Sequence, residues 1–131
     1  FANVDLNDKC NLINTDGKLI SEQWFDDCYR FTEGFAAVEL NNKWNFIDKN
    51  GKFILEQWFD YCYTFIKGFA VVKLNGKWNL INTNGKIISK QWFDNCWNFN
   101  DGFSTVKLNE KYYKIDENGN LYDENMKLFK S

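Results

Sequence analysis

Short runs of apolar side chains, separated by asparagine and glycine, are the main pattern in this chain. Phe35–Leu40 and Lys43–Asp48 are two such runs, and we expect both to be strands. Between them Asn41–Asn42 predicts a two-residue hairpin turn, because asparagine tolerates a positive φ. In the second run Trp44 and Ile47 point to opposite faces, so both faces of the hairpin carry apolar groups that need to be covered.

The segment after this hairpin predicts a further strand and a connection. Asp48–Gly51 has aspartate at the first turn position and glycine where a left-handed residue is required, which predicts a second turn. Lys52–Gln57 then predicts a third strand, which makes each unit a three-stranded meander. Trp58, Cys62 and Phe65 follow at i, i+4 and i+7, and this spacing favours a loop with a short helical turn.

The pattern returns every 34 residues, and segments 35–68 and 69–102 are identical at 20 of 34 positions. A fixed period of this size is typical of arrays whose like units bury a shared core by stacking. We therefore predict one all-β repeat array over residues 1–131. Its units are about 1–34, 35–68, 69–102 and 103–131, and the second-turn glycines are Gly17, Gly51, Gly85 and Gly119.

We expect these units to form a solenoid-like stack, with a small closed, propeller-like ring as the alternative. The expected repeat core includes one tryptophan and one cysteine from each of three units. These residues are Trp24, Trp58, Trp92, Cys28, Cys62 and Cys96. The last unit has Met126, Leu128 and Lys130 at the places of Trp92, Asp94 and Cys96, so the tail Met126–Ser131 is expected to cap the array.

The four cysteines are expected to be free. Three of them hold the same place in successive units, one repeat step apart, whereas a disulfide needs Cα atoms within about 7 Å. We interpret them as small buried apolar residues. The fourth, Cys10, stands where Trp44 and Trp78 stand in later units.

Composition and charge exclude several classes of function. The net charge is −2, and 15 lysines and one arginine are interspersed with 18 acids, which gives no case for nucleic-acid binding. No apolar run is long enough to span a membrane. Histidine is absent, so the usual serine or cysteine nucleophile with a histidine base is excluded.

Recurring acids do not change this picture. Asp26, Asp60 and Asp94 share one phase of the repeat and hence one environment, whereas a catalytic pair needs two different environments. We interpret them as turn or cap hydrogen-bond acceptors, and we expect no enzyme activity, no cofactor and no metal site.

The 34-residue repeat resembles the WG (or KWG) repeat family. The segments that carry the resemblance are Asn75–Ile81, Asn84–Lys86, Trp92–Asp94 and Gly102–Phe103. The glycine that follows tryptophan in that family is replaced here, by Asn45, Asn79 and Tyr113. The resemblance implies a β-rich, bacterial-type repeat scaffold without known catalytic residues, often in surface or secreted proteins. Residues 109–119 are also similar to one choline-binding or cell-wall-binding repeat, but those repeats recur at a shorter spacing.

The aromatic residues give the best candidate surface. Trp44, Trp78 and Tyr112 share one register and would form a ladder of rings if they were exposed. We predict a non-enzymatic scaffold that binds another protein. The alternatives are a cell-wall or carbohydrate (choline-like) ligand held by the ladder, and a structural protein that assembles with itself.

Overall fold

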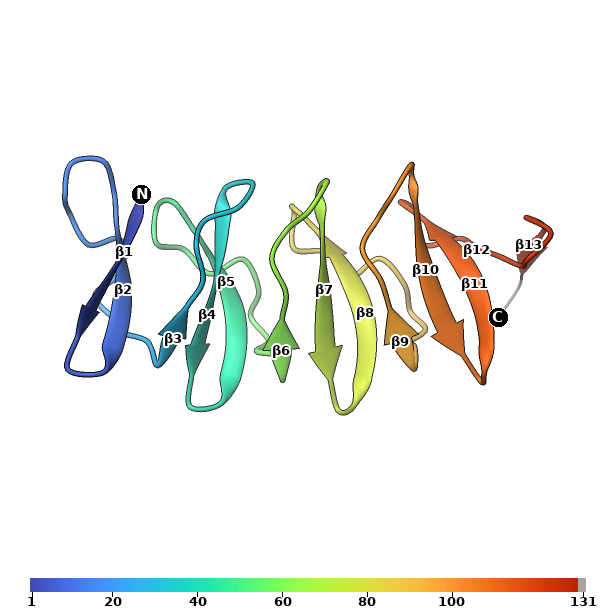
Figure 1. Ribbon diagram of the computed structural model, residues 1–131, viewed down its shortest axis with the longest axis horizontal. Coiled ribbons are helices and arrows are strands. Elements are labelled where there is room, and N and C mark those ends of the chain that lie inside the picture. The colour runs from blue at the N-terminus through green and yellow to red at the C-terminus, as the bar shows by residue number, and fades with distance from the viewer. Residues whose placement is uncertain (130–131) are drawn as a thin grey trace. The chain divides into compact units, whose positions relative to one another are not determined.

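The computed structural model describes residues 1–129, which form only strands, turns and bends (Figure 1). It divides into two compact units, of which the first is Phe1–Thr64 and the second begins at Phe65. Unit 1 contains β1 (Ala2–Leu6), β2 (Lys9–Ile13), β3 (Asp27–Cys28), β4 (Phe35–Leu40), β5 (Lys43–Asp48) and β6 (Tyr61–Cys62). Unit 2 contains β7 (Phe69–Leu74), β8 (Lys77–Asn82), β9 (Asn95–Cys96), β10 (Phe103–Leu108), β11 (Lys111–Asp116), β12 (Leu121–Tyr122) and β13 (Leu128–Phe129). Nothing in residues 1–129 forms a helix long and apolar enough to cross a membrane. The predicted all-β repeat array is confirmed.

Four antiparallel hairpins contain all the described strands longer than two residues: β1–β2, β4–β5, β7–β8 and β10–β11. In β4–β5 the register runs from Phe35 opposite Asp48 to Leu40 opposite Lys43, as the apolar pattern predicts. The two residues of its turn, Asn41 and Asn42, have φ angles of 53° and 67°. These are left-handed conformations that asparagine adopts more readily than most residues.

The second turn of each repeat is built around an aspartate or asparagine side chain. Asp48 Oδ1 accepts hydrogen bonds from the N–H groups of Asn50 and Lys52, at 2.9 and 3.0 Å. Gly51 follows with φ +82°, and its N–H donates to the Asp48 carbonyl at 3.1 Å. A Cβ added to Gly51 would lie 1.9 Å from the Ile20 carbonyl oxygen, so this glycine also lets two neighbouring repeats approach each other.

The third strand predicted over Lys52–Gln57 is wrong. In that segment Phe53 makes only an isolated bridge, with Ile47. The reason is the buried Asn45, whose side-chain amide donates to the Leu55 carbonyl at 2.8 Å. A side chain from β5 thus takes the Leu55 carbonyl, while the Ile54 N–H donates to the Phe46 carbonyl at 3.0 Å, so these groups are satisfied without a continuous strand pairing.

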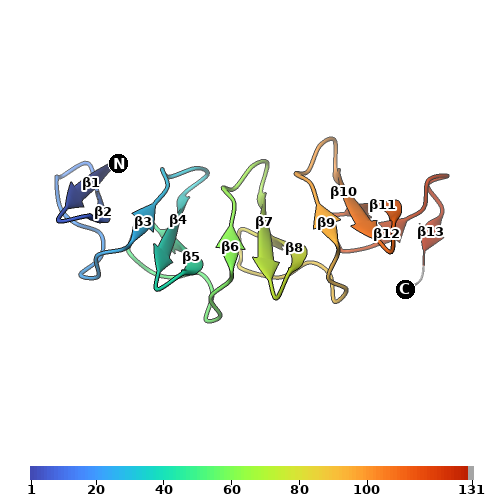
Figure 2. The same ribbon diagram turned by 60° about the horizontal axis from the view of Figure 1, so that its bottom comes forward.

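The helical turn predicted after Trp58 is also wrong. Phe59 exchanges two backbone hydrogen bonds with Trp44, both at 2.8 Å, and residues Tyr61–Cys62 form the short strand β6. The edge of β5 offers the Trp44 backbone groups to Phe59, and this pairing outweighs the weak helical spacing. The equivalent strands β3 and β9 pair with β4 and β10, and Figure 2 shows each beside its partner.

The core lies on both faces of the hairpins. One cluster in unit 1 consists of Cys10, Leu12, Phe25, Cys28, Ala36, Val38 and Ile47. A cluster in unit 2 consists of Val71, Leu80, Ile88, Phe93, Cys96, Phe99, Val106, Ile115 and Leu121. The most completely buried aromatic rings are phenylalanines such as Phe25, Phe59 and Phe93. The tryptophans that precede them, Trp24, Trp58 and Trp92, are only partly buried.

Two of the cysteines form a disulfide, so the expectation of four free cysteines is wrong. Cys10 and Cys28 are bonded with a Cα–Cα distance of 6.1 Å, and they are 18 residues apart rather than one repeat step. Cys10 occupies the tryptophan place in β2, and paired hydrogen bonds between Cys10 and Phe25 bring the following segment back beside it. Cys62 and Cys96 are free and buried, and burial raises the pKa of both thiols.

The last repeat ends in a second copy of its own turn. Residues 123–129 (DENMKLF) follow residues 116–122 (DENGNLY), and strand β12 pairs with β13 as an extra hairpin, seen in red in Figure 1. Asp123 Oδ1 accepts the N–H groups of Asn125 and Lys127, both at 2.9 Å. Met126 takes the place of the glycine, with φ +59°. Of the predicted cap, Lys130 and Ser131 lie outside the described residues.

Candidate functional site

A row of side chains crosses the sheet next to the turn of each of three hairpins, and we call it the cross-strand row. In unit 1 Asp27 in β3 lies opposite Glu39 in β4, which lies opposite Trp44 in β5. In unit 2 the corresponding residues of β9, β10 and β11 are Asn95, Lys107 and Tyr112. Strands β7 and β8 contribute the pair Lys73 and Trp78. Directly opposite residues share one face of the sheet, so each row forms a continuous surface.

The rows differ in what lies over the aromatic ring. The Lys73 ammonium lies 5.2 Å from the centroid of the Trp78 ring, and the Lys107 ammonium lies 5.7 Å from that of Tyr112. Both are cation–π contacts, in which the ring's negative face attracts the cation. The row of unit 1 has Glu39 at the lysine position and therefore supplies no cation of its own.

Trp44 sits inside an aromatic cluster of unit 1. The rings of Tyr29 and Tyr61 lie on it with centroid distances of 5.0 Å each, and the two tyrosine hydroxyls are hydrogen-bonded to each other. Tyr63 packs against Tyr61 at 4.7 Å and is 45% exposed, whereas Trp44 is 5% exposed. Burial, followed by the hydrogen bond with Tyr29, raises the pKa of Tyr61.

Acidic groups surround this cluster. Burial raises the pKa of Glu39, and the negative charges of Asp27 and Asp26 raise it further. Asp26 is paired with the Lys9 ammonium and also accepts a hydrogen bond from the Asn41 N–H at 2.8 Å. Within the described residues the structure gives neither Asp27 nor Glu39 an ion-pair partner. The row of unit 1 therefore holds two opposed carboxyl groups, an arrangement that costs stability.

Unit 2 exposes a pair of large aromatic side chains. Trp97, just after β9, is 43% exposed, and Tyr112 in β11 is 57% exposed. Their ring centroids lie 6.0 Å apart. The backbone N–H of Trp97 donates to the Thr105 carbonyl at 3.0 Å, which holds the tryptophan backbone beside β10. The pair forms an exposed aromatic surface whose rings also carry a hydroxyl and an indole N–H.

The three candidate ladder residues are placed differently by the structure. Trp44 is buried, Trp78 is partly buried and Tyr112 is exposed. They do not form one uniformly exposed ladder. Sequence reasoning did not identify Tyr63 and Trp97 as exposed aromatic residues. A signal was present, because Tyr29, Tyr63 and Trp97 follow one another at steps of 34 residues.

The recurring aspartates hold neighbouring elements together. Asp94 is paired with Lys77 and accepts the Asn109 N–H at 2.9 Å, which repeats the arrangement of Asp26. The hydrogen bond from the lysine is the main reason why the pKa of Asp26 and of Asp94 lies below its ordinary value. These carboxylates act as the acceptors that were predicted from their phase. Among residues 1–129, no three Cys, Asp or Glu side chains gather as metal ligands.

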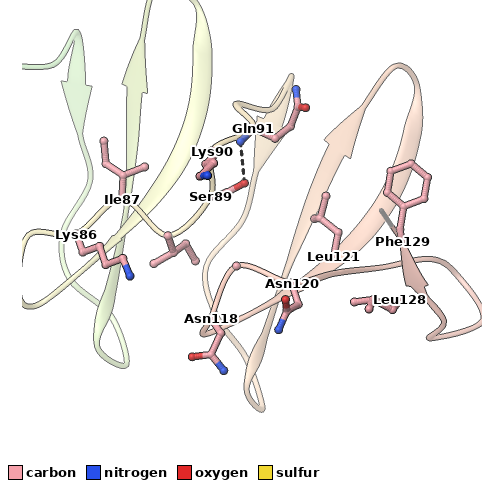
Figure 3. A pocket seen from close by; sticks show the side chains of 12 residues that line it. Lys86, Ile87, Ser89, Lys90, Gln91, Asn118, Asn120, Leu121, Leu128 and Phe129 are labelled. Carbon is pink, nitrogen blue, oxygen red and sulfur yellow. Dashed lines mark hydrogen bonds between the residues drawn. The ribbon is translucent and has the colours of Figure 1, made fainter. Parts of the chain in front are cut away.

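An open hollow of about 790 Å³ lies in unit 2 between the loop at 86–91 and the turn before β12. Figure 3 shows Lys86 and Ile87 on one side of it and Leu128 and Phe129 on the other. The lysines that line it are exposed, and the Ser89 hydroxyl already accepts a hydrogen bond from the Gln91 N–H at 3.1 Å. The buried Ser89 is thus already engaged within its own loop, and the hollow is a weaker candidate than the aromatic rows.

The family model described as "WG containing repeat" matches residues 12–44, 46–78 and 80–112. The chain belongs to this family. The matched WG repeats begin 34 residues apart and end at Trp44, Trp78 and Tyr112, so they follow the period found in the sequence.

The WG repeats of this chain have a buried asparagine where the resemblance led us to expect glycine. Asn79 donates to the carbonyls of Ser89 and Gln91, at 2.8 and 3.4 Å, and accepts the Leu80 N–H at 2.7 Å. Asn11 and Asn45 are fully buried in the same way. The last repeat has Tyr113 here, and in it the β12–β13 hairpin replaces the loop that the asparagine holds in earlier repeats.

One solved structure similar to this chain is the 1.35 Å crystal structure of a protein of unknown function from Bacteroides caccae. The two are 15% identical, with a TM-score of 0.38, over 88% of this chain and 53% of the other. The chain thus spans about half the length of that neighbour. No curated protein matches the chain.

Proposed function

We propose that this chain is a non-enzymatic repeat scaffold that binds a protein partner through its exposed aromatic surface. The observation that carries the proposal is the Trp97–Tyr112 pair, two large rings 6.0 Å apart that remain 43% and 57% exposed. Tryptophan and tyrosine are enriched at the energetic centres of protein interfaces. Both residues lie on or beside strands, so little conformational entropy is lost when a partner covers them.

A protein partner fits the rings better than a sugar or a choline-like ligand. Such ligands need a free ring face, and the Lys73 and Lys107 ammonium groups already lie over Trp78 and Tyr112. Trp44 is covered by its tyrosine neighbours. A partner that packs against the ring edges and the lysine stems does not meet this obstacle.

The environment of the acids supports a role without catalysis. Asp26 and Asp94 are each engaged by a lysine and by a backbone N–H, and the chain has no histidine to act as a base at neutral pH. The Cys10–Cys28 disulfide further supports an oxidising compartment such as the cell surface or the exterior.

The test is a capture experiment with matched variants. The intact chain is immobilised and exposed to lysate and envelope fractions of its source organism, and bound proteins are identified by mass spectrometry. The candidate partner is then titrated against the parent chain and against Trp97→Ser/Tyr112→Ser, which should bind at least about tenfold more weakly, because interface rings of this kind dominate binding energy.

Leu19→Ser is the matched control, because it removes a 47% exposed apolar side chain from another surface. It should bind like the parent. Equal loss in both variants, or release of the bound material by free sugar or choline, would contradict the proposed function.

A further inference from the structure

We propose that the cross-strand row of unit 1, Asp27–Glu39–Trp44 with Tyr29 and Tyr61, receives a lysine or arginine side chain from the partner protein. This inference rests on the proposed function and deepens it by naming the chemistry of the partner. The site is the aromatic and acidic face of β3, β4 and β5.

The first argument comes from comparison among the repeats. At the position opposite the ring, the two later hairpins have Lys73 and Lys107, and each places its ammonium over the ring, at 5.2 and 5.7 Å. The backbone register is the same in unit 1, where Glu39 lies opposite Trp44. The two later repeats therefore hold a cation at this place, whereas unit 1 holds an anion there. Tyr29 and Tyr61 cover the Trp44 ring, so an incoming cation would meet the carboxyl groups and the partly exposed tyrosine rings beside it.

The second argument is that the charges of this row are unbalanced. Asp27 lies directly opposite Glu39, whereas the row of β9, β10 and β11 has Asn95 at the place of Asp27. Like charges directly opposite each other destabilise a sheet, and burial and Asp27 hold the pKa of Glu39 above its ordinary value. A cation placed between these carboxyl groups would relieve this repulsion.

The third argument is the charge of the surrounding unit. Residues 1–64 carry 6 basic and 11 acidic side chains, whereas residues 65–131 carry 10 basic and 7 acidic ones. The first unit therefore attracts cationic segments and repels acidic ones. Tyr29 and Tyr61 are partly exposed and add apolar surface for the methylene stem of a lysine or arginine.

The experiment uses the full chain and a defined probe, the peptide acetyl-Lys-Gly-Lys-Gly-Lys-amide, with acetyl-Glu-Gly-Glu-Gly-Glu-amide as the negative probe. Binding is followed by ¹H–¹⁵N NMR. The lysine peptide should shift the amides of Asp27 and Glu39 and the indole signal of Trp44. Glu39→Lys places a third lysine over the row and should weaken binding at least about fivefold, with Glu39→Gln intermediate. Glu39→Lys removes the opposed carboxyl pair, so its fold should be at least as stable as that of the parent.

Glu56→Lys is the matched control, because it makes the same change of charge at an exposed residue of unit 1 outside the row. It should bind the lysine peptide within about twofold of the parent, since exposed charge pairs contribute little. Equal weakening by Glu39→Lys and Glu56→Lys, or shifts spread over all acidic residues, would overturn the proposal. If a captured partner depends on Trp97 and Tyr112 but is indifferent to Glu39→Lys, the proposed function stands and this inference fails. If the lysine peptide binds at the row but no partner protein is captured, the cation site is supported and the proposed scaffold function is contradicted.

Discussion

Gly51 is a position where one added methyl group would meet the backbone of the preceding repeat. In Gly51→Ala the new Cβ would lie 1.9 Å from the Ile20 carbonyl oxygen and 3.1 Å from its carbonyl carbon. The Ile20 backbone cannot simply move away, because its N–H donates to the Leu12 carbonyl at 2.9 Å. Gly17 supplies the reference: it has φ +76° in the same kind of turn, with no atom within 4 Å of an added Cβ.

The comparison separates two costs. Gly17→Ala introduces only left-handed strain, roughly 1–2 kcal/mol, partly offset by about 0.4–1 kcal/mol of lost freedom in the unfolded chain. We therefore expect a loss of about 1 kcal/mol. Gly51→Ala carries the same strain plus the overlap with Ile20, and overpacking of this kind costs about 1–3 kcal/mol. Its free energy of unfolding should fall by about 2–4 kcal/mol.

The assay is urea unfolding at pH 7, followed by tryptophan fluorescence and by circular dichroism. A second pair of variants tests the assignment of the two costs. Asparagine tolerates a positive φ, so Gly17→Asn should be nearly neutral, whereas Gly51→Asn still places a Cβ against Ile20. If Gly51→Ala and Gly17→Ala lower the urea midpoint equally, with unchanged slopes, then Gly51 does not contact the preceding repeat and the reasoning is refuted.

Three further predictions concern other single residues. Asn45→Ala removes the buried amide that donates to the Leu55 carbonyl and should lower the free energy of unfolding in urea by about 1–3 kcal/mol. Asn50→Ala changes an exposed asparagine and is the near-neutral control. Equal losses of stability in the two variants would contradict a structural role for the Asn45 hydrogen bond. Met126→Gly should raise stability by about 0.5–1 kcal/mol, the difference between left-handed strain and the entropic cost of glycine; a lower melting temperature would contradict this. The hydrogen bond from Lys9 lowers the pKa of Asp26 below its ordinary value of 3.8. The stabilisation that this carboxylate gives is therefore complete above pH 3.8 and is lost as the pH falls through the lower pKa of the folded state. The urea midpoint should therefore fall on acidification below about pH 4, and Asp26→Asn should flatten that decline; an unchanged acid limb in the variant would refute it.

Much of the fold could be predicted because its turns are encoded locally. The pair Asn41–Asn42 and the run Asp48–Gly51 each need only their own side chains to set the backbone, so the hairpins and the 34-residue step followed from sequence. The third strand did not follow, because the Leu55 carbonyl in Lys52–Gln57 is held by the side chain of Asn45 and not by the backbone of a strand partner. A buried amide such as that of Asn45 has no periodic signature that would reveal it in advance.

The disulfide and the exposed surface were hidden by the same regularity that revealed the repeats. Comparing like positions leads to cysteines one step apart, whereas the bond joins Cys10 to Cys28 across two different positions of the repeat. Like positions also have unlike neighbours. Trp44 is covered by tyrosine rings, whereas Tyr112 belongs to the last full hairpin and remains 57% exposed. Periodicity therefore predicts where a ring lies along the fold but not how much solvent reaches it.

The carboxylates that join successive hairpins have a consequence for how the gene can change length. Asp26 joins Lys9 of the hairpin before it to the backbone of Asn41 in the hairpin after it, 17 and 15 residues away. Duplication or deletion of a whole 34-residue segment would leave an equivalent carboxylate, lysine and turn at every joint, whereas any other length would separate them. Unequal recombination between these similar stretches can therefore lengthen or shorten the protein without altering how one repeat meets the next.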